Sequence, residues 1–453
     1  MEESEYFGIV KEKLSNAEAG IGSLVRVTRG DGLTVEGRVL PRYMLSSPDI
    51  LVIKLSNGYN VGIRIDYSTK IEKIGESEEA KPAGTPAPLE EYTGERPEAK
   101  VYIIGTGGTI ASRIDYRTGA VYPYISTDEL LQAVPELNRL AEVEVFELYN
   151  IFSEDMTPLH WTRIAEKIYE LFNQGATGIV VAHGTDTMGY TAAALAFAFR
   201  DTLPGPLVLT GSQRSSDRPS SDSAFNIISS VLVASMSGIR ESMVVMHGVT
   251  GDNYALAHRG VRVRKMHTSR RDAFQSINTL PLLKIYPDKM AIEEIGKPLF
   301  RKPFHGSMEL KAKFSDKVGL VKHYPGMKGE IIDMLIDKGY RGIVIEGTGF
   351  GHVSNEAIKS IERAVDSGIP VVATSQCIFG RVNLNVYSTG RRMLKAGVIP
   401  AEDMLPETAY VKLSWLLGQG LEFMEIKKLF LLNMVGEVSD RTIIRSYPRW
   451  YHG

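Results

Sequence analysis

KVYIIGTGGTIA, at residues 100–111, joins an apolar run to a loop rich in glycine and threonine. The β-branched residues of the run are typical of a buried parallel strand, and the glycines that follow predict a tight loop. In open α/β sheets, ligands bind outside the carboxyl ends of the strands. We therefore expect Thr106 and Thr109 to lie where a substrate binds.

The loop does not match the two common nucleotide-binding patterns. A dinucleotide-binding loop needs a third glycine near position 110, where this chain has Ile110, and a phosphate-binding P-loop needs a Gly-Lys-Ser/Thr sequence that this loop lacks. An ordinary strand-to-helix turn is the simplest alternative. A second threonine-bearing loop at the end of another strand would favour a functional site over that alternative.

Such a loop occurs in GIVVAHGTDTM, at residues 178–188. Its apolar half predicts another strand, and Thr185 and Asp186 follow the end of that strand. Two strands of one sheet would bring Thr109 and Thr185 to the same edge. Converging hydroxyls beside an acid are what an amidohydrolase with a threonine nucleophile requires.

The sequence resembles the bacterial-type L-asparaginase/glutaminase family, which implies a two-lobed α/β fold with mostly parallel sheets. Within that family it most resembles the D subunits of archaeal glutamyl-tRNA(Gln) amidotransferases, because an additional N-terminal domain is present. The similarity extends over about residues 100–440 and rests on TGGTIA at 106–111, SEDM at 153–156, HGTDTM at 183–188, TGSQR at 210–214 and Lys265.

The composition of the chain predicts three folded parts and a linker. Residues 1–75 contain short strand-like runs with turn signals, which predict a small all-β barrel of the SH3-like or Sm-like type. Residues 76–98 are rich in proline and glutamate and predict a linker. Alternating strand-like and helix-like segments predict an α/β lobe that carries the active site at 99–305, and a smaller α/β lobe at 306–453.

Charge and cysteine content narrow the class of protein. The chain has 52 Lys and Arg residues against 54 Asp and Glu residues, so no overall basic charge marks a free-standing nucleic-acid binder. The N-terminus lacks the apolar core of a secretory signal, and no apolar run reaches the ~18 residues of a membrane span. We expect a soluble cytoplasmic protein without membrane association, in which the single Cys377 is a buried small hydrophobic residue.

Hydrolysis of an amide through a hydroxyl requires a nucleophile, a base for its proton and donors for the oxyanion. Lys265 lies in a basic run, so the residues alone predict only a surface charge there. The family resemblance instead implies that Lys265 forms a proton relay with Thr185 and Asp186, while Thr109 attacks the amide carbon. The division of labour between the two threonines stays open.

The head group of a free amino acid needs carboxylates for its ammonium and hydroxyl or backbone donors for its carboxylate. We expect Asp186 and Glu154 to bind the ammonium, and Ser153 with the backbone around Gly108 and Gly184 to bind the carboxylate. By resemblance, many asparaginases carry Gln at the position of Glu154. The preference for glutamine or asparagine is therefore open.

Other polar residues are expected to be structural. Asp217 and Asp222 suit caps of turns and of the following helix. We expect no metal and no cofactor in this chain, because four histidines lack the spacing of metal ligands: His183, His247, His258 and His267.

The resemblance implies a glutaminase subunit that supplies ammonia to a partner, the E subunit. That partner would use ATP and Mg to activate Glu-tRNA(Gln), would make Gln-tRNA(Gln) and would bind most of the tRNA, in a heterotetramer of two D and two E subunits. A stand-alone cytoplasmic L-asparaginase is the alternative. A non-enzymatic module that binds amino acids or RNA is a third interpretation, which the two threonine loops and Lys265 disfavour.

Overall fold

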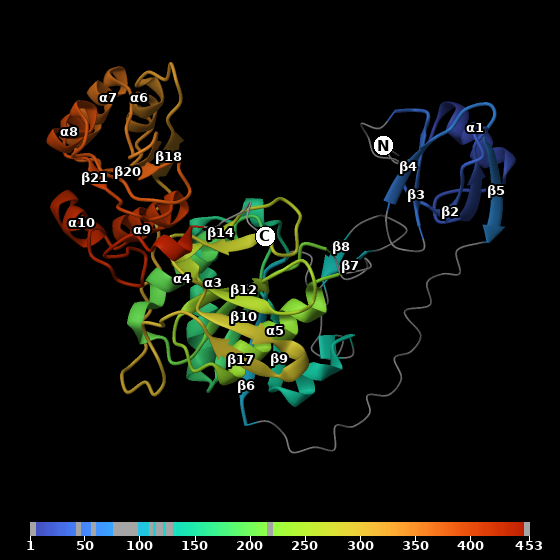
Figure 1. Cartoon of the computed structure of the whole chain (residues 1–453), viewed down its shortest axis with the longest axis horizontal. Helices are drawn as coiled ribbons and strands as arrows, with labels where there is room; N and C mark the ends of the chain where they lie inside the picture. Colours follow the sequence, from blue (N-terminus) through green and yellow to red (C-terminus); the bar gives the residue numbers. More distant parts are fainter. Residues whose placement is uncertain are drawn as a thin grey trace.

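The computed structural model describes residues 6–41, 47–55, 60–75, 98–107, 112–114, 121–123, 130–131, 133–214 and 221–447. Figure 1 shows a small N-terminal domain in blue, a central lobe in green and yellow, and a C-terminal lobe in orange and red. None of the helices within these ranges combines the length and the apolar character that a membrane crossing needs.

The N-terminal domain is a five-stranded antiparallel sheet with one helix, in the strand order β4-β3-β2-β1-β5. The helix corrects the expectation of an all-β domain. Val10 and Leu14, one helical turn apart, join the same buried cluster as the strands, so this helix completes the core. The elements are α1 (Gly8–Asn16), β1 (Leu24–Thr28), β2 (Thr34–Val39), β3 (Ile50–Lys54), β4 (Asn60–Arg64) and β5 (Lys70–Gly75).

The central lobe contains an eight-stranded sheet in the order β17-β16-β13-β12-β11-β10-β6-β9. The strands from β9 to β12 in this order are parallel, and β13, β16 and β17 are antiparallel. Its strands are β6 (Lys100–Gly105), β9 (Glu142–Glu147), β10 (Gly178–Ala182), β11 (Leu207–Thr210), β12 (Ser242–His247), β13 (Ala255–Arg259), β16 (Leu283–Tyr286) and β17 (Ala291–Glu294). Two short hairpins lie outside this sheet: β7 (Ser112–Ile114) with β8 (Val121–Pro123), and β14 (Val263–Lys265) with β15 (Phe274–Ser276).

Helices cover both faces of the large sheet, as the alternation of strands and helices predicts. Ile103 of β6 belongs to one core cluster with α5 (Ser223–Met236), whereas its neighbour Ile104 belongs to another with α3 (Pro158–Asn173) and α4 (Met188–Phe199). Because successive side chains of a strand point to opposite faces, α5 lies on one face and α3 and α4 on the other.

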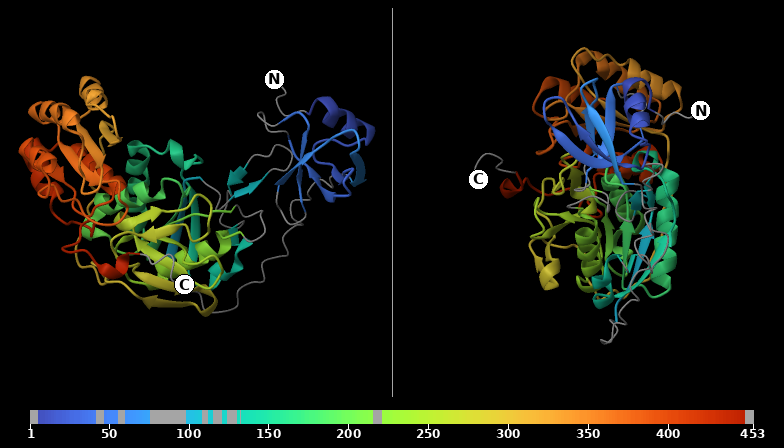
Figure 2. Two further views of the ribbon diagram at one scale, coloured as in Figure 1. Left: turned by 45° about the horizontal axis from the view of Figure 1, so that its top comes forward. Right: turned by 90° about the vertical axis from the view of Figure 1, so that its right-hand side faces the viewer.

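The C-terminal lobe has four parallel strands in the order β18-β19-β20-β21. It packs directly on the central lobe, as Figure 2 shows, and the stacked rings of Phe197 and Trp415 join the two. The elements are β18 (Val318–Lys322), α6 (Glu330–Asp337), β19 (Gly342–Gly347), α7 (Asn355–Asp366), β20 (Val371–Ser375), α8 (Ser388–Lys395), β21 (Ile399–Pro400), α9 (Pro406–Gly418) and α10 (Phe423–Phe430).

Cys377 is exposed, so the prediction of a buried cysteine is wrong. It lies two residues beyond the end of β20, and its backbone N–H donates to Ser375 Oγ at 2.9 Å. The cysteine belongs to the loop that follows the strand, where no other element of the described chain covers its side chain.

Candidate active site

The two glycine- and threonine-rich loops leave neighbouring strands at the same level of the sheet. β6 and β10 are parallel, and Gly105 pairs with Ala182 as the last residue of each strand. Thr106 is buried, and both its backbone N–H and its hydroxyl donate to the Ala182 carbonyl at 3.0 Å. Thr106 therefore joins the strands instead of facing a substrate, which corrects our expectation for it. Gly108 and Thr109 lie outside the described residues.

Three of the predicted side chains meet beyond the end of β10. Lys265, the last residue of β14, donates from Nζ to Thr185 Oγ1 at 2.9 Å and to Asp186 Oδ1 at 2.8 Å. The lysine side chain is 14% exposed and the aspartate side chain is 66% exposed. The lysine is thus withdrawn from solvent, while the carboxylate stays accessible to a ligand.

This arrangement is suited to proton transfer. A charged lysine can only donate hydrogen bonds, as Lys265 does to both oxygen atoms. A neutral amine at the same position would have a lone pair within reach of the Thr185 hydroxyl, which is the geometry that a general base needs. Asp186 Oδ1 lies where it accepts a hydrogen bond from the lysine once the lysine has taken up a proton.

The predicted substrate-binding residues Ser153 and Gly184 lie against each other. Ser153 belongs to a 3-10 turn (Ser153–Asp155) between β9 and α3, and its carbonyl accepts a hydrogen bond of 2.6 Å from the hydroxyl of Thr187. A Cβ atom at Gly184 would lie 2.8 Å from the Cβ of Ser153, so only glycine allows this contact. Glu154 is exposed on the same turn.

The loop after β6 packs on the same turn segment. Gly107 has φ +106°, and a Cβ atom there would lie 2.2 Å from the Ile151 carbonyl oxygen. Both the left-handed backbone and the close approach require glycine. The described parts of the loops after β6, β9 and β10 therefore pack against one another at one edge of the sheet.

A buried chain of hydrogen bonds, which the sequence analysis did not identify, supports the loop after β10. Trp161 Nε1 donates to Thr191 Oγ1 at 3.1 Å, Thr191 bonds to His183 Nε2 at 2.9 Å, and His183 Nδ1 donates to the Gly184 carbonyl at 2.7 Å. The carbonyl is only an acceptor, so His183 Nδ1 is protonated, and in the neutral histidine Nε2 then accepts from the Thr191 hydroxyl. Burial agrees with this, because it lowers the pKa of His183 to about 4.

Acidification is expected to destabilise the protein through buried histidines. The pKa of His183 is lowered to about 4 and that of His258 to about 3, whereas an unfolded histidine titrates near ~6.5. The unfolded chain then binds more protons, so this stability is present above that value and is lost as the pH falls toward the folded-state pKa. Each histidine should lower the free energy of unfolding by about 1.4 kcal/mol per pH unit in this window.

Urea unfolding between about pH 7 and pH 5 measures this dependence. His183→Gln should reduce the slope of stability against pH, and the same substitution of the exposed His267 should leave the slope unchanged. An unaltered slope in His183→Gln would contradict the assignment of a neutral buried histidine.

Asp222 anchors the TGSQR segment after β11. Its carboxylate accepts from the backbone N–H groups of Gln213 at 3.0 Å and Arg214 at 2.9 Å, and from Asn226 Nδ2 at 3.0 Å. Asp222 is structural, as expected, but its side chain makes no cap hydrogen bond to α5 and binds the preceding loop instead. Asp217 lies outside the described residues.

The other three histidines considered as metal ligands contact neighbouring polar groups. Within the described ranges, no group of three or more His, Cys, Asp or Glu residues is arranged to hold a metal ion. The partners are Asn226 and Asp252 for His247, Ser276 for His258, and the backbone N–H groups of Ser269 and Arg270 for His267.

Family models match most of the chain. "Asparaginase, N-terminal" matches residues 100–295, "Glutaminase/Asparaginase C-terminal domain" matches 317–430, and "GatD N-terminal domain" matches 19–74. The first two correspond to the central and C-terminal lobes, and the third corresponds to the N-terminal domain.

Solved structures show the same architecture for the two larger lobes. The thermostable L-asparaginase from Thermococcus kodakarensis matches with a TM-score of 0.67 and 32% identity, over 76% of this chain and 100% of its own. L-asparaginase I from Vibrio cholerae matches with a TM-score of 0.66 and 30% identity, over 75% of this chain and 99% of its own. The fold and the paired threonine loops thus define an asparaginase-type α/β protein.

Relatives that match over nearly the whole chain define the family more narrowly. The D subunit of the glutamyl-tRNA(Gln) amidotransferase of Pyrococcus abyssi is 56% identical over 97% of this chain and 100% of its own length. That of Aeropyrum pernix is 54% identical over 93% of this chain and 99% of its own length. The chain belongs to the family of glutamyl-tRNA(Gln) amidotransferase D subunits.

Proposed function

We propose that this chain is the glutaminase subunit of a Glu-tRNA(Gln) amidotransferase and supplies ammonia to a partner subunit. The observation that carries the proposal is the contact of Lys265 Nζ with Thr185 at 2.9 Å and with Asp186 at 2.8 Å, just beyond the end of β10. Membership of the D-subunit family supports glutamine as the amide donor. Residues 99–305 form the catalytic lobe in this proposal.

The proposed reaction proceeds through a covalent intermediate on a threonine. Thr109, assigned by family resemblance, attacks the side-chain amide carbon of glutamine to form a tetrahedral intermediate, while its proton passes to the unit of Thr185, Asp186 and Lys265. That proton is returned to the leaving nitrogen, the C–N bond breaks, ammonia departs and an ester remains on the threonine. Water then hydrolyses the ester to glutamate and restores the threonine hydroxyl.

The substrate head group would be held by residues of the loops after β6, β9 and β10. Asp186 and Glu154 are exposed carboxylates suited to the α-ammonium. Ser153 and the backbone around Gly184 and Gly108 would donate to the α-carboxylate. The contact of Ser153 with Gly184 supports this grouping.

A partner of the E-subunit type would use ATP and Mg to activate Glu-tRNA(Gln) and convert it to Gln-tRNA(Gln). We propose a cytoplasmic heterotetramer of two D and two E subunits, with the tRNA bound mainly by the partner. Ion pairs of the N-terminal domain support that division, because several of its arginines are already paired with acids. The pairs are Arg26–Glu36 at 2.7 Å, Arg29–Asp31 at 3.1 Å and Arg64–Asp49 at 3.0 Å.

Ammonia release from glutamine tests the proposal. The purified chain should be stimulated about tenfold or more by the partner together with Glu-tRNA(Gln) and ATP, because a coupled pair of sites commonly shows effects of ~5–150-fold. A spectrophotometric ammonia assay with each component omitted in turn measures the coupling. Full activity of the isolated chain on glutamine would count against the proposal.

A stand-alone L-asparaginase is the second candidate, which the likeness to solved L-asparaginases favours. It would use the same residues and need no partner. The ratio of kcat/KM for asparagine to that for glutamine, measured on the isolated chain, separates the two candidates. A high ratio with no response to the partner would select the asparaginase.

A further inference from the structure

The hairpin that carries Lys265 does not belong to the main sheet. β14 and β15 form a separate two-stranded sheet, in which Lys265 pairs with Phe274 and Val263 with Ser276. The hydrogen bond from Ile277 N to the Arg262 carbonyl, at 2.8 Å, closes the base of this hairpin. An isolated hairpin is only marginally stable, so other contacts must hold this one in place.

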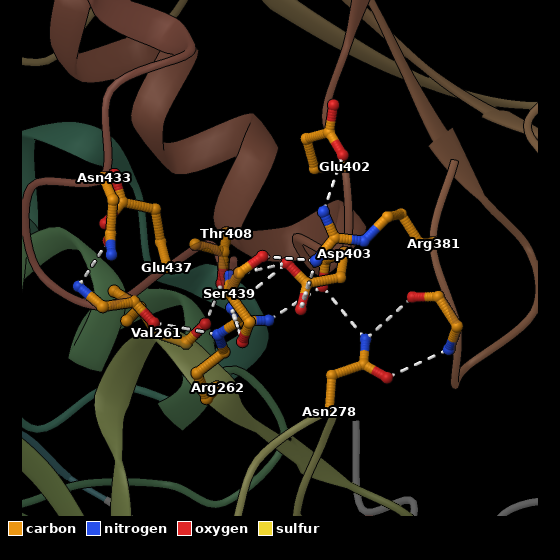
Figure 3. Close-up of polar contacts among 12 residues, drawn as sticks. Val261, Arg262, Asn278, Arg381, Glu402, Asp403, Thr408, Asn433, Glu437 and Ser439 are labelled. Atoms are coloured by element: carbon orange, nitrogen blue, oxygen red, sulfur yellow. Dashed lines mark hydrogen bonds and ion pairs between the residues drawn. The ribbon is translucent and has the colours of Figure 1, made fainter. Parts of the chain in front are cut away.

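Arg262, at one end of that base, is a buried link to the C-terminal lobe. It precedes Lys265 by three residues in the sequence, and its side chain is 1% exposed. Figure 3 shows its guanidinium among groups of the C-terminal lobe and the segment after α10. It donates to the Gly436 carbonyl at 2.9 Å, the Asp403 carbonyl at 2.9 Å, Asp403 Oδ1 at 3.2 Å and Ser439 Oγ at 2.8 Å.

Asn278, at the other end of the base, reaches the same carbonyl. Its Nδ2 donates to the Asp403 carbonyl at 3.0 Å and to the Gly380 carbonyl at 3.1 Å, and its Oδ1 accepts from Gly380 N at 2.9 Å. The residue has φ +58°, a left-handed conformation in which asparagine is enriched. Both ends of the hairpin base are therefore joined to one carbonyl oxygen of the C-terminal lobe.

Asp403, which accepts these hydrogen bonds, is itself fixed by further contacts. The Asp403 side chain is 1% exposed, and its Oδ1 also accepts from Ser439 N at 2.9 Å. Arg381 lies 3.9 Å from its second oxygen and pairs with Glu402 at 2.9 Å. Buried ion pairs contribute little net stability relative to apolar packing, but breaking one leaves an uncompensated charge. Such a group holds a defined position more than it adds stability.

We propose that Arg262 and Asn278 are positioning residues, which hold Lys265 on Thr185 and Asp186 by fixing its hairpin to Asp403. This inference rests on the proposed function, because it assigns these residues to the same reaction. Neither residue touches the reacting atoms. Their effect reaches the site through the backbone of β14, and the C-terminal lobe thereby controls the geometry of a site in the central lobe.

The hydrogen bonds of Arg262 and Asn278 to Asp403 are called the clamp below. Two substitutions test the clamp, and a third is the control. Arg262→Lys keeps the charge but loses the planar fork that serves four acceptors. Asn278→Gly keeps the left-handed backbone but removes the amide. The control is Arg240→Lys, because the Arg240 guanidinium also serves several carbonyls, those of Arg301, Asp201 and Leu203, yet all of these belong to the central lobe.

Each clamp variant should lower kcat for glutamine by about 10- to 100-fold with little change in KM, because a misplacement of ~1 Å can cost ~10²-fold. Activity is measured on the full chain with its partner and Glu-tRNA(Gln), together with the thermal midpoint. Arg240→Lys should lower the thermal midpoint without lowering kcat. Clamp variants that keep the wild-type kcat, or lose no more of it than the control, would overturn the inference.

A double-mutant cycle separates positioning from general damage. In a Lys265→Met background, Arg262→Lys should reduce the residual rate no further, because its effect passes through that lysine. Equal losses in both backgrounds would overturn the inference and leave the proposed function intact. Wild-type activity of Lys265→Met alone would instead reject the proposed function.

Discussion

Lys265→Met should lower kcat for glutamine hydrolysis by about 10²- to 10⁴-fold while the protein stays folded, the range typical of a lost general base. The substitution keeps an unbranched side chain that ends at the position of Cε but removes the amine that contacts Thr185 at 2.9 Å and Asp186 at 2.8 Å. Steady-state ammonia release in the presence of the partner and Glu-tRNA(Gln) measures the loss. The thermal midpoint, measured in parallel, reports on folding.

A second substitution at the same position distinguishes proton transfer from simple charge. Lys265→Arg retains a cation near Asp186 but cannot become neutral at any working pH, so it should be as inactive as Lys265→Met. Lys289→Met, at the exposed surface, is the control and should retain the wild-type rate. Substantial activity in Lys265→Arg would mean that the site needs the positive charge and not a base.

Thr109→Val and Thr185→Val should each abolish rapid turnover, but for different reasons. Loss of Thr109 removes the proposed nucleophile, so no ester can form. Loss of Thr185 interrupts the contact with Lys265, so ester formation should continue about 10²- to 10⁴-fold more slowly. Mass spectrometry of acid-quenched reactions should find the glutamyl adduct on the peptide that contains Thr109 in the wild type and, after longer incubation, in Thr185→Val.

Thr106→Val is the matched control for these two variants. Its hydroxyl donates to the Ala182 carbonyl, which also accepts from the backbone N–H of the same residue, so the carbonyl keeps a partner after the substitution. The change should cost about 1 kcal/mol of stability and preserve hydrolysis. An adduct on Thr185 in the wild type would reverse the assignment of the two threonines.

Short-range patterns were sufficient to predict most elements of the two larger lobes. The start of α3 illustrates why, because a threonine followed by proline is a local signal for the start of a helix, and α3 begins at Pro158 after Thr157. The apolar residues from Trp161 onward recur at helical spacing and are buried. Spacing of apolar residues and helix caps act within a few residues, so the local sequence contains the information. The helix α1 was not predicted, because a short helix in which only Val10 and Leu14 are buried has a weak pattern of apolar residues.

No local sequence pattern predicted which side chains from distant parts of the chain contact one another. The basic run around Lys265 predicts a surface, yet the structure withdraws Lys265 beside Thr185 and buries Arg262 beneath the C-terminal lobe. Thr106 belongs to the same sequence motif as Thr109, but its hydroxyl donates to the Ala182 carbonyl and so joins β6 to β10. The exposure of a charged or polar group depends on which element covers it, and that element is encoded elsewhere in the chain.

By itself, the sequence determined which segments become strands and helices, where the strand ends carry threonines and acids, and to which family the motifs point. Only the tertiary structure decided that β6 lies beside β10, that Lys265 reaches Thr185, and that Asp403 holds both ends of the lysine hairpin. The physical reason is range: periodicity and caps act over one or two turns, whereas these contacts join residues about 80 to 140 positions apart and exist only once the lobes have packed.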